Sequence, residues 1–130
     1  MTATATTETA TIAQELVSLC RAGKNLEAVD KLYSEQIVSV EPVGNEQMPA
    51  QMSGIKAIRG KNQWWIDNNE VHSAELNGPF VGEGQFAVHG TYETTFKPTG
   101  ERKQFTEMAL YTVKDGKIVR EQFFYHVPTP

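Results

Sequence analysis

Three glutamates, Glu41, Glu107 and Glu121, are the residues of this sequence best suited to acid/base chemistry. Glu41 directly precedes a proline, and the other two lie inside runs rich in β-branched and aromatic residues. A carboxyl group that faces an apolar cavity has its charged form disfavoured, so its pKa rises and it can exchange protons near pH 7. A carboxylate that faces solvent pairs instead with a basic side chain. The available bases are Arg102, Lys103 and Arg120.

The histidines and the cysteine are weaker candidates for catalytic or metal-binding roles than the three glutamates. The three histidines are far apart and show no ligand spacing on one element, whereas a metal site needs three or four converging ligands. We therefore expect no metal and no cofactor. His72 could act as an acid or a base, although a surface position is the alternative. Cys20 is the single cysteine, which excludes an internal disulfide and suits a small apolar residue on a helix.

The last third of the chain predicts an antiparallel meander. Residues 85–96, 104–113 and 117–127 are β-branched and aromatic runs. The first two are separated by Lys-Pro-Thr-Gly and the last two by Lys-Asp-Gly, which are hairpin signals because glycine supplies positive φ. Two further strands are expected, a brief one over 37–41 and an edge strand over 71–81.

Apolar residues at helical spacing predict three helices. The first runs from Thr9 to Ala22, the second from Asn25, as its N-cap, to Tyr33, and the third over 54–68 with Ser53 as its cap. Residues 45–52 are expected to form a mobile loop. In the third helix Trp65 faces inward and Trp64 lies at an edge or interface. Gly60 costs helix stability, which favours close packing against another backbone there. The predicted order is α-α-β-α-β-β-β-β.

Composition bounds the class of protein. The chain has 130 residues, of which 39% are hydrophobic, and a formal net charge of −4. This suits one domain over residues 9–130, after a disordered Thr/Ala-rich tail over residues 1–8. The acidic balance argues against a nucleic-acid partner. No apolar run is long enough for a membrane span, and the start lacks the features of a signal peptide, so we expect a cytoplasmic protein without a membrane partner.

The sequence resembles the NTF2-like superfamily over residues 9–127. Glu41-Pro-Val-Gly ends the first predicted strand, Ser53-Gly54 and Ile58 begin the third helix, and Asp-Gly-Lys-Ile-Val opens the last strand. Within the superfamily the chain looks like the SnoaL-like proteins and is similar to ketosteroid isomerases. The resemblance implies an α+β, cystatin-like fold, in which a cone-shaped curved antiparallel sheet wraps around helices and encloses an apolar cavity.

The resemblance also implies roles for individual residues. In ketosteroid isomerases the acid before the proline is the general base, and this position is Glu41. The oxyanion donors of those enzymes fall at about Leu16 and Ala109, which cannot donate a hydrogen bond. The loss of one such donor can cost about 3 kcal/mol, which argues against steroid isomerisation by that mechanism.

The same resemblance indicates which side chains face the cavity. Alternation of side chains along the strands predicts that Gly90 and Val119 also face the cavity, unless a bulge reverses the alternation in the rest of a strand. Tyr92, Tyr111 and Tyr125 bring hydroxyl groups that could replace a missing oxyanion donor. The candidate ligand-binding residues are Leu16, Ile58, Trp65, Val88, Tyr92, Ala109, Tyr111, Phe123 and Tyr125, with Glu41, Glu107 and Glu121 as the catalytic candidates.

The opposite face carries His89, Leu110, Phe124 and His126, and its apolar members favour a homodimer through the outer face of the sheet. Three functions remain open. The first is binding of a small apolar, carbonyl-bearing molecule with cofactor-free isomerase, cyclase or dehydratase chemistry, Glu41 being the base. The second is binding of such a molecule without chemistry. The third is an association module whose working surface is the outer sheet face.

Overall fold

The computed structural model describes residues 3–127, with side chains from residue 8 onward. Three helices and six strands make up this part of the chain. The helices are α1 (Ala3–Arg21), α2 (Asn25–Leu32) and α3 (Ile55–Asn68). The strands are β1 (Tyr33–Val40), β2 (Gln51–Ser53), β3 (Asn69–Val81), β4 (Gln85–Phe96), β5 (Glu101–Lys114) and β6 (Lys117–Phe124).

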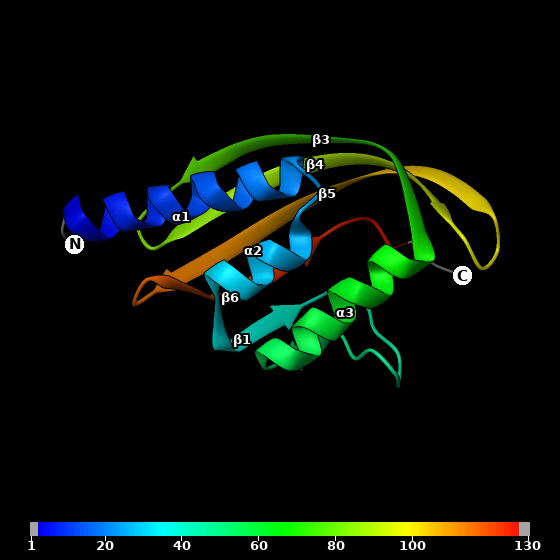
Figure 1. Cartoon of the computed structure of the whole chain (residues 1–130), viewed down its shortest axis with the longest axis horizontal. Coiled ribbons are helices and arrows are strands. Elements are labelled where there is room, and N and C mark those ends of the chain that lie inside the picture. The colour runs from blue at the N-terminus through cyan, green and yellow to red at the C-terminus, as the bar shows by residue number, and fades with distance from the viewer. Residues whose placement is uncertain (1–2, 128–130) are drawn as a thin grey trace.

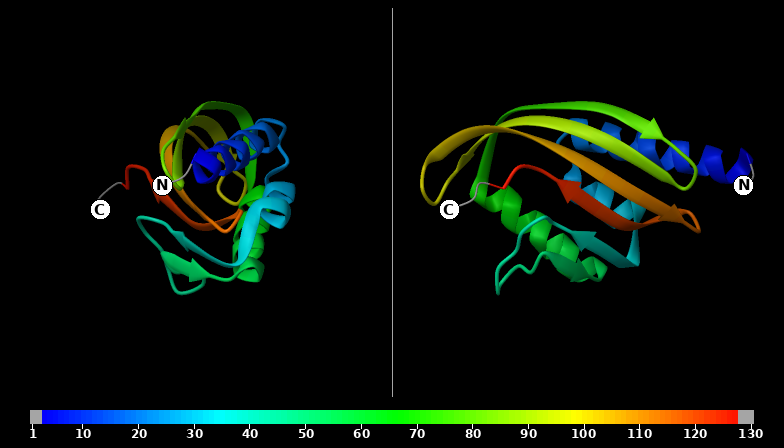
Figure 2. Two further views of the ribbon diagram at one scale, coloured as in Figure 1. Left: turned by 90° about the vertical axis from the view of Figure 1, so that its left-hand side faces the viewer. Right: turned by 180° about the vertical axis from the view of Figure 1, so that it is seen from behind.

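All six strands form one curved sheet in the order β2-β1-β6-β5-β4-β3. Neighbouring strands are antiparallel except β1 and β6, which are parallel. The helices lie along the concave side of this sheet (Figures 1 and 2). The predicted α+β architecture, a curved sheet wrapped around helices, is confirmed, although the parallel pairing of β1 with β6 departs from the wholly antiparallel sheet that was expected.

The C-terminal meander follows its turn chemistry. Strand β4 has the predicted bounds, and β3 lies at the edge of the sheet, as expected. At the β5–β6 turn Asp115 and Gly116 both have positive φ, 51° and 77°, which is the backbone of a tight hairpin. Residues 125–127 of the predicted last strand are not part of β6.

Two features of the sheet were not predicted. The first is β2, whose first two residues lie in the stretch expected to be a mobile loop and whose third, Ser53, was expected to cap α3. It has no pattern of its own and exists because Met52 and its neighbours pair with β1, Met52 opposite Ser39. The second is the start of β1 at Tyr33, directly after α2. This half of the strand was not predicted, because it consists mostly of polar residues. The order is therefore α-α-β-β-α-β-β-β-β.

The first helix begins earlier than the sequence predicts. Helix α1 starts at Ala3, so residues 3–8 of the predicted disordered tail are helical, while residues 1 and 2 lie outside the described part. Adding residues to an existing helix costs little, and alanine is the best helix former, so the Thr/Ala string can extend α1.

The predicted caps of the other helices are wrong. Lys24 rather than Asn25 occupies the N-cap of α2, and Gly54 rather than Ser53 occupies that of α3, without side-chain hydrogen bonds at either cap. Gly54 has φ 93°, a conformation that glycine adopts readily. Its N–H donates to the Ile37 carbonyl at 2.8 Å, which ties the start of α3 to β1.

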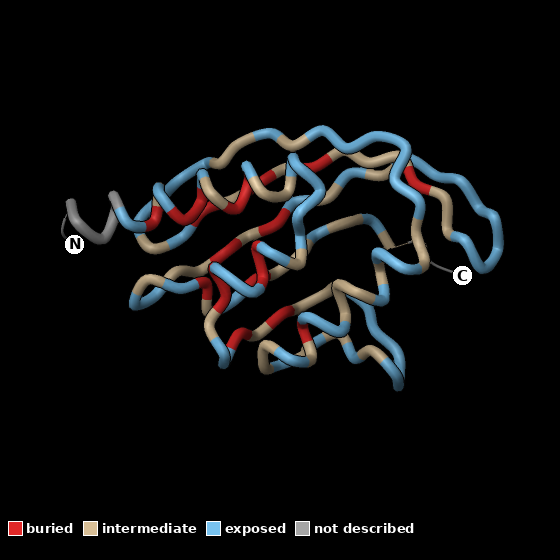
Figure 3. The backbone as a smooth tube through the Cα atoms, in the orientation of Figure 1, coloured by how far each residue is buried: buried red, intermediate tan, exposed pale blue. Residues whose placement is uncertain are grey.

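Burial is greatest where the helices meet the middle of the sheet (Figure 3). The core joins α1 and α2 to β1, β4, β5 and β6, and Cys20 packs against it, as expected for a helical cysteine. Burial raises the pKa of the Cys20 thiol to about 11. The prediction for Gly60 is wrong, because a Cβ built on this residue meets nothing within 4 Å.

Candidate functional site

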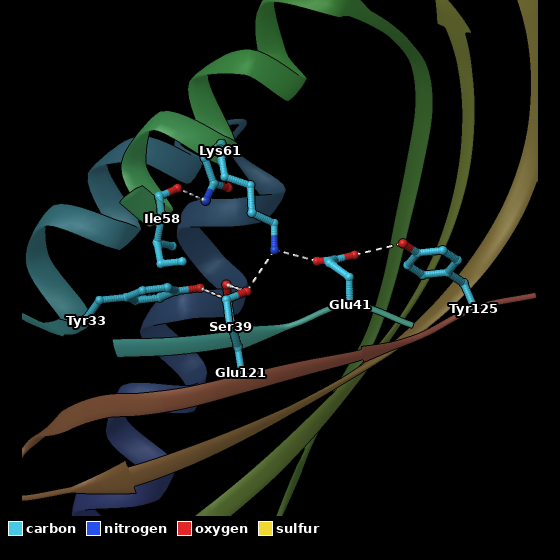
Figure 4. Close-up of polar contacts among 8 residues, drawn as sticks. Tyr33, Ser39, Glu41, Ile58, Lys61, Glu121 and Tyr125 are labelled. Carbon is cyan, nitrogen blue, oxygen red and sulfur yellow. Dashed lines mark hydrogen bonds and ion pairs between the residues drawn. The ribbon is translucent and has the colours of Figure 1, made fainter. Parts of the chain in front are cut away.

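A chain of polar side chains runs through the interior between α3, β1 and β6 (Figure 4). It begins on β1, where alternation turns Tyr33, Ile37 and Ser39 inward and buries them. Glu41 continues the same alternation just after the strand ends. These residues meet Lys61 from α3 and Glu121 from β6.

The Glu121 end of the chain is buried and fully hydrogen-bonded. Glu121 is only 2% exposed. The Tyr33 hydroxyl donates to its Oε1, and the Ser39 hydroxyl donates to its Oε2 at 2.7 Å. Burial raises the pKa of Glu121, while the two hydrogen bonds and the nearby Lys61 ammonium act in the opposite direction. This carboxyl therefore has a fixed orientation and no access to solvent.

The Glu41 end is more open. Lys61 Nζ donates to Ser39 Oγ at 2.8 Å and to Glu41 Oε2 at 2.6 Å, and the Tyr125 hydroxyl donates to Glu41 Oε1 at 2.9 Å. The Lys61 and Glu41 side chains are 17% and 19% exposed. Lys61 also lies 5.1 Å from the ring centroid of Phe123. Glu41 is thus a partly buried carboxylate held in an ion pair.

Glu107 is the third carboxyl and has a different environment. Within residues 3–127 it has no hydrogen-bond or ion-pair partner. Burial, followed by the charges of Glu41 and Glu121, raises its pKa to about 8, although Lys61 lowers it. Glu107 is therefore mostly protonated at pH 7.

A glycine and a tyrosine form the surroundings of Glu107. Gly90 pairs with Glu107 across β4 and β5. A Cβ built on Gly90 would lie 2.5 Å from the Tyr92 hydroxyl oxygen, so the Tyr92 ring fills the space above the glycine. Burial and then Glu107 raise the pKa of Tyr92. The glycine leaves room for the tyrosine beside the carboxyl.

The predicted ligand-binding residues divide into two groups. Leu16, Ile58, Val88, Ala109 and Tyr111 belong to the buried core. Trp65, Tyr92, Phe123 and Tyr125 are only partly buried. Burial raises the pKa values of Tyr111 and Tyr125.

The predicted inward position of Val119 is wrong. The register of β5 and β6 shifts between Thr112 and Val113, so that Ile118 and Arg120 pair with adjacent residues and Val119 is the extra residue of a bulge. Ile118 is buried in its place, and Glu121 still faces inward.

Sequence analysis missed Lys61, Ser39 and Tyr33. A signal was present for Lys61, which lies three residues after Ile58 and four before Trp65, on the stripe of α3 that faces inward. A lysine on the apolar stripe of a helix requires a carboxylate partner. For Ser39 the alternation with Ile37 and Glu41 inside the predicted strand was a signal. Tyr33 gave none, because it was assigned to the end of the second helix rather than to the strand.

Among the described residues no three histidine, cysteine, aspartate or glutamate side chains are placed to hold a metal ion. No described helix combines the length and the apolar character that crossing a bilayer requires.

A curved sheet wrapped around three helices, with carboxyl groups on its concave side, places the chain among NTF2-like α+β proteins. A family model of the SnoaL-like domain matches residues 6–125, so the chain belongs to the SnoaL-like family. The predicted resemblance is confirmed. No curated protein sequence matches it significantly.

Solved structures agree with this assignment. A structure from Mesorhizobium loti is 40% identical in sequence to this chain. That protein is described both as a candidate SnoaL-like polyketide cyclase and as a carbohydrate phosphatase. The match covers 89% of this chain and 97% of that one, with a TM-score of 0.84.

Two more distant structures share the fold alone. An NTF2-like protein from Burkholderia xenovorans is 15% identical, with a TM-score of 0.72 and coverage of 93% of this chain and 91% of that one. An epoxide hydrolase of Mycobacterium tuberculosis, described as similar to LEH, is 13% identical, with a TM-score of 0.69 and coverage of 93% and 84%.

Proposed function

We propose that this protein is a cofactor-free acid/base enzyme that acts on a small, largely apolar molecule bearing a carbonyl group. Glu41 is the base and Glu107 is the acid. One observation carries the proposal: two carboxyl groups of the interior have opposite environments. Glu41 is ion-paired with Lys61, whereas Glu107 is half-buried and has no hydrogen-bond or ion-pair partner among residues 3–127. Such a separation of two similar groups is how one site supplies both an acid and a base at neutral pH.

The proposed step is proton abstraction beside a carbonyl group. The Glu41 carboxylate takes a proton from the α carbon, and the C–H electron pair moves into the carbonyl to form an enolate. Each oxygen of Glu41 keeps a lone pair beyond its present hydrogen bond, so the carboxylate can accept this proton. Return of the proton to another carbon gives an isomer. Attack of the enolate on a second carbonyl closes a ring and leaves an alkoxide, which takes the proton back from Glu41.

Glu107 supplies the hydrogen bond to the enolate oxygen. The resemblance to ketosteroid isomerases implies a donor at Ala109, which has none to offer. Glu107 lies two residues before Ala109 on the same face of β5, and its pKa of about 8 keeps the donor proton on the carboxyl at pH 7. A positioned donor of this kind contributes about 3 kcal/mol to the stabilisation of the transition state.

The test measures proton exchange and needs no natural substrate. Flat ketones are incubated with the protein in D2O, and loss of the α-proton signal is followed by NMR. Glu41→Gln is expected to slow exchange at least about 100-fold and Glu107→Leu at least about 10-fold, by loss of the base and of the donor. Glu75→Gln, an exposed glutamate on β3, is the control. Exchange that persists in Glu41→Gln would exclude this base.

Binding without chemistry is the second candidate. The observation that favours it is that both oxygens of Glu41 already accept a hydrogen bond, one from Lys61 and one from Tyr125. Ketones that bind to the wild type and to Glu41→Gln with equal affinity, and that exchange no α-proton in either, would support this candidate against the enzyme.

We also propose that two copies of the chain associate through the outer face of the sheet. Met108 and Phe124 lie directly opposite each other on β5 and β6 and are 37% and 48% exposed. Paired exposed apolar side chains on a sheet face are typical of an interface. Light scattering during gel filtration should report a dimer, and Phe124→Glu should give a monomer with an unchanged circular dichroism spectrum.

A further inference from the structure

An open groove lies on the side of α3 that faces β2 and the loop before it. Its volume is about 600 Å³, within the range of small-molecule sites. Its lining comes from that loop, from β2 and from the first three turns of α3: Asn45, Gln47, Met48, Met52, Ala57, Gly60, Lys61 and Trp64. None of the ligand-binding residues predicted from the sequence belongs to this set.

The walls of the groove are fixed in place. Asn45 Oδ1 accepts hydrogen bonds from the backbone N–H groups of Gln47 and Met48, at 3.0 and 2.8 Å, which shapes the loop that carries Met48. Met52 is held by the pairing of β2 with β1. The Trp64 ring packs against Phe96 with 6.1 Å between ring centroids, and 43% of Trp64 remains exposed. Two thioethers and one indole therefore form an apolar surface on backbone that these contacts hold in place.

Gly60 forms part of the groove and has no role in packing. A glycine in the middle of a helix lowers its stability relative to alanine. The usual reason for such a residue is close approach of another backbone, but a Cβ built here meets nothing within 4 Å. The missing side chain therefore keeps this part of the groove flat and open.

Lys61 connects the groove to the polar chain of the interior. Its ammonium has three N–H donors, of which Ser39 and Glu41 accept two. The positive charge of Lys61 is already balanced by Glu41. Glu121 lies on the far side of the Ser39 hydroxyl group, to which it is hydrogen-bonded. A ligand carboxylate would add a negative charge beside these two carboxyl groups. The remaining donor suits a neutral acceptor such as a ketone oxygen.

We infer that this groove binds a flat, largely apolar, neutral molecule, whose rings lie between Met48, Met52 and Trp64 over Gly60 and whose single acceptor oxygen takes a hydrogen bond from Lys61. The occupant differs in location from the substrate proposed for the interior. Because the acceptor meets the lysine that holds Glu41, occupation of the groove changes the ion pair of the interior site. The inference does not depend on catalysis.

Methyl NMR of methionine tests the groove directly. The chain has four methionines: two in the groove, Met108 on the outer sheet face, and Met1 outside the described residues. With 2-acetylnaphthalene as the probe, the methyl signals of Met48 and Met52 should shift and that of Met108 should not. 2-Naphthoate and 2-isopropenylnaphthalene should bind at least fivefold more weakly. A shift confined to Met108 would overturn the inference.

Gly60→Ala separates a ligand role from a structural one. The variant should unfold at a higher temperature than the wild type, because alanine favours the helix, yet bind the ketone probe at least tenfold more weakly. Lys56→Ala, exposed on the same helix and outside the groove, is the control and should bind normally. In Lys61→Leu the preference for the ketone over the hydrocarbon should vanish. Equal affinity in Gly60→Ala and wild type would refute the proposal, whether or not the interior proves catalytic.

Discussion

Glu121 and Glu107 lie on neighbouring strands and face the same interior, but their surroundings differ. Glu121 is 2% exposed and accepts hydrogen bonds from Tyr33 and Ser39. Glu107 is half-buried, receives no hydrogen bond from any of the residues 3–127 and has a pKa of about 8. A position on the inner face of the sheet therefore does not by itself define the role of a carboxyl group.

The difference is one of hydrogen-bonding partners. A buried carboxyl whose oxygens are both bonded is rigid and holds its neighbours in place, because removing it would leave their hydroxyl groups without an acceptor. A half-buried carboxyl without partners retains its proton and can donate a hydrogen bond to a ligand. We assign Glu121 to positioning, through Ser39 and Lys61, and Glu107 to hydrogen-bond donation.

The largest expected effect is on stability. Glu121→Ala should lower the free energy of unfolding by about 4 kcal/mol, because it opens a buried cavity and leaves the Tyr33 and Ser39 hydroxyl groups without an acceptor. Glu107→Ala should change it by less than about 1 kcal/mol, since it removes a carboxyl group that has no partner to lose. Urea unfolding of both variants measures the difference. Equal losses would remove the distinction between the two carboxyl groups.

The second effect is a dependence of stability on pH. The folded pKa of Glu107, about 8, lies above its ordinary value of 4.5. The folded state thus binds the proton of Glu107 more tightly than the unfolded state does. The contribution of Glu107 to the free energy of unfolding is therefore greatest below pH 4.5 and falls as the pH rises towards 8. The slope cannot exceed about 1.4 kcal/mol per pH unit, and partial exposure reduces the total to about 2 kcal/mol.

Urea unfolding at pH 5, 6, 7 and 8 measures this slope. In Glu107→Gln the contribution of this group should be absent, so the variant should lose less stability than the wild type between pH 5 and 8. Parallel profiles for the two proteins would mean that Glu107 titrates normally in the folded state.

Much of the sheet and the facing of its residues could be predicted from the sequence, because both depend on local patterns. The hairpins follow from glycine in the turns, and the inward position of Glu107 follows from alternation along a regular strand. The bulge at Val119 could not be predicted, because it depends on the pairing of β6 with β5. Strand β2 is likewise defined by its partner strand.

The contacts that distinguish the carboxyl groups are the least predictable part. Tyr33 and Glu121 lie 88 positions apart in the chain, and Glu41 and Tyr125 lie 84 positions apart. Periodicity gives the face on which a residue lies, but not which residue of another element it meets. The sequence therefore singled out Glu41 as the base but could not distinguish the surroundings of Glu107 from those of Glu121.

The third prediction concerns the space beside Glu107. Gly90→Ala places a Cβ 2.5 Å from the Tyr92 hydroxyl oxygen, so the ring must move away, at a cost of about 1 to 2 kcal/mol. In the background of Tyr92→Ala the same change should cost nothing, because the ring that it displaces is absent. A double-mutant cycle by urea unfolding measures this coupling. Independent, additive effects would contradict the proposed contact.

The smallest expected effects are the losses of stability on removing the tyrosine hydroxyl group at each end of the chain of polar side chains. Tyr33 is 7% exposed and donates to the buried Glu121, so Tyr33→Phe should lower the free energy of unfolding by about 1.5 kcal/mol. Tyr125 donates to Glu41, which is partly exposed and keeps its bond to Lys61. Tyr125→Phe should therefore cost less than about 0.5 kcal/mol, because water can replace the lost hydroxyl. Both substitutions remove one oxygen atom, so thermal and urea unfolding compare the two hydrogen bonds directly. A larger loss for Tyr125→Phe would place the rigid end of the chain at Glu41 and reverse the roles assigned to the two ends.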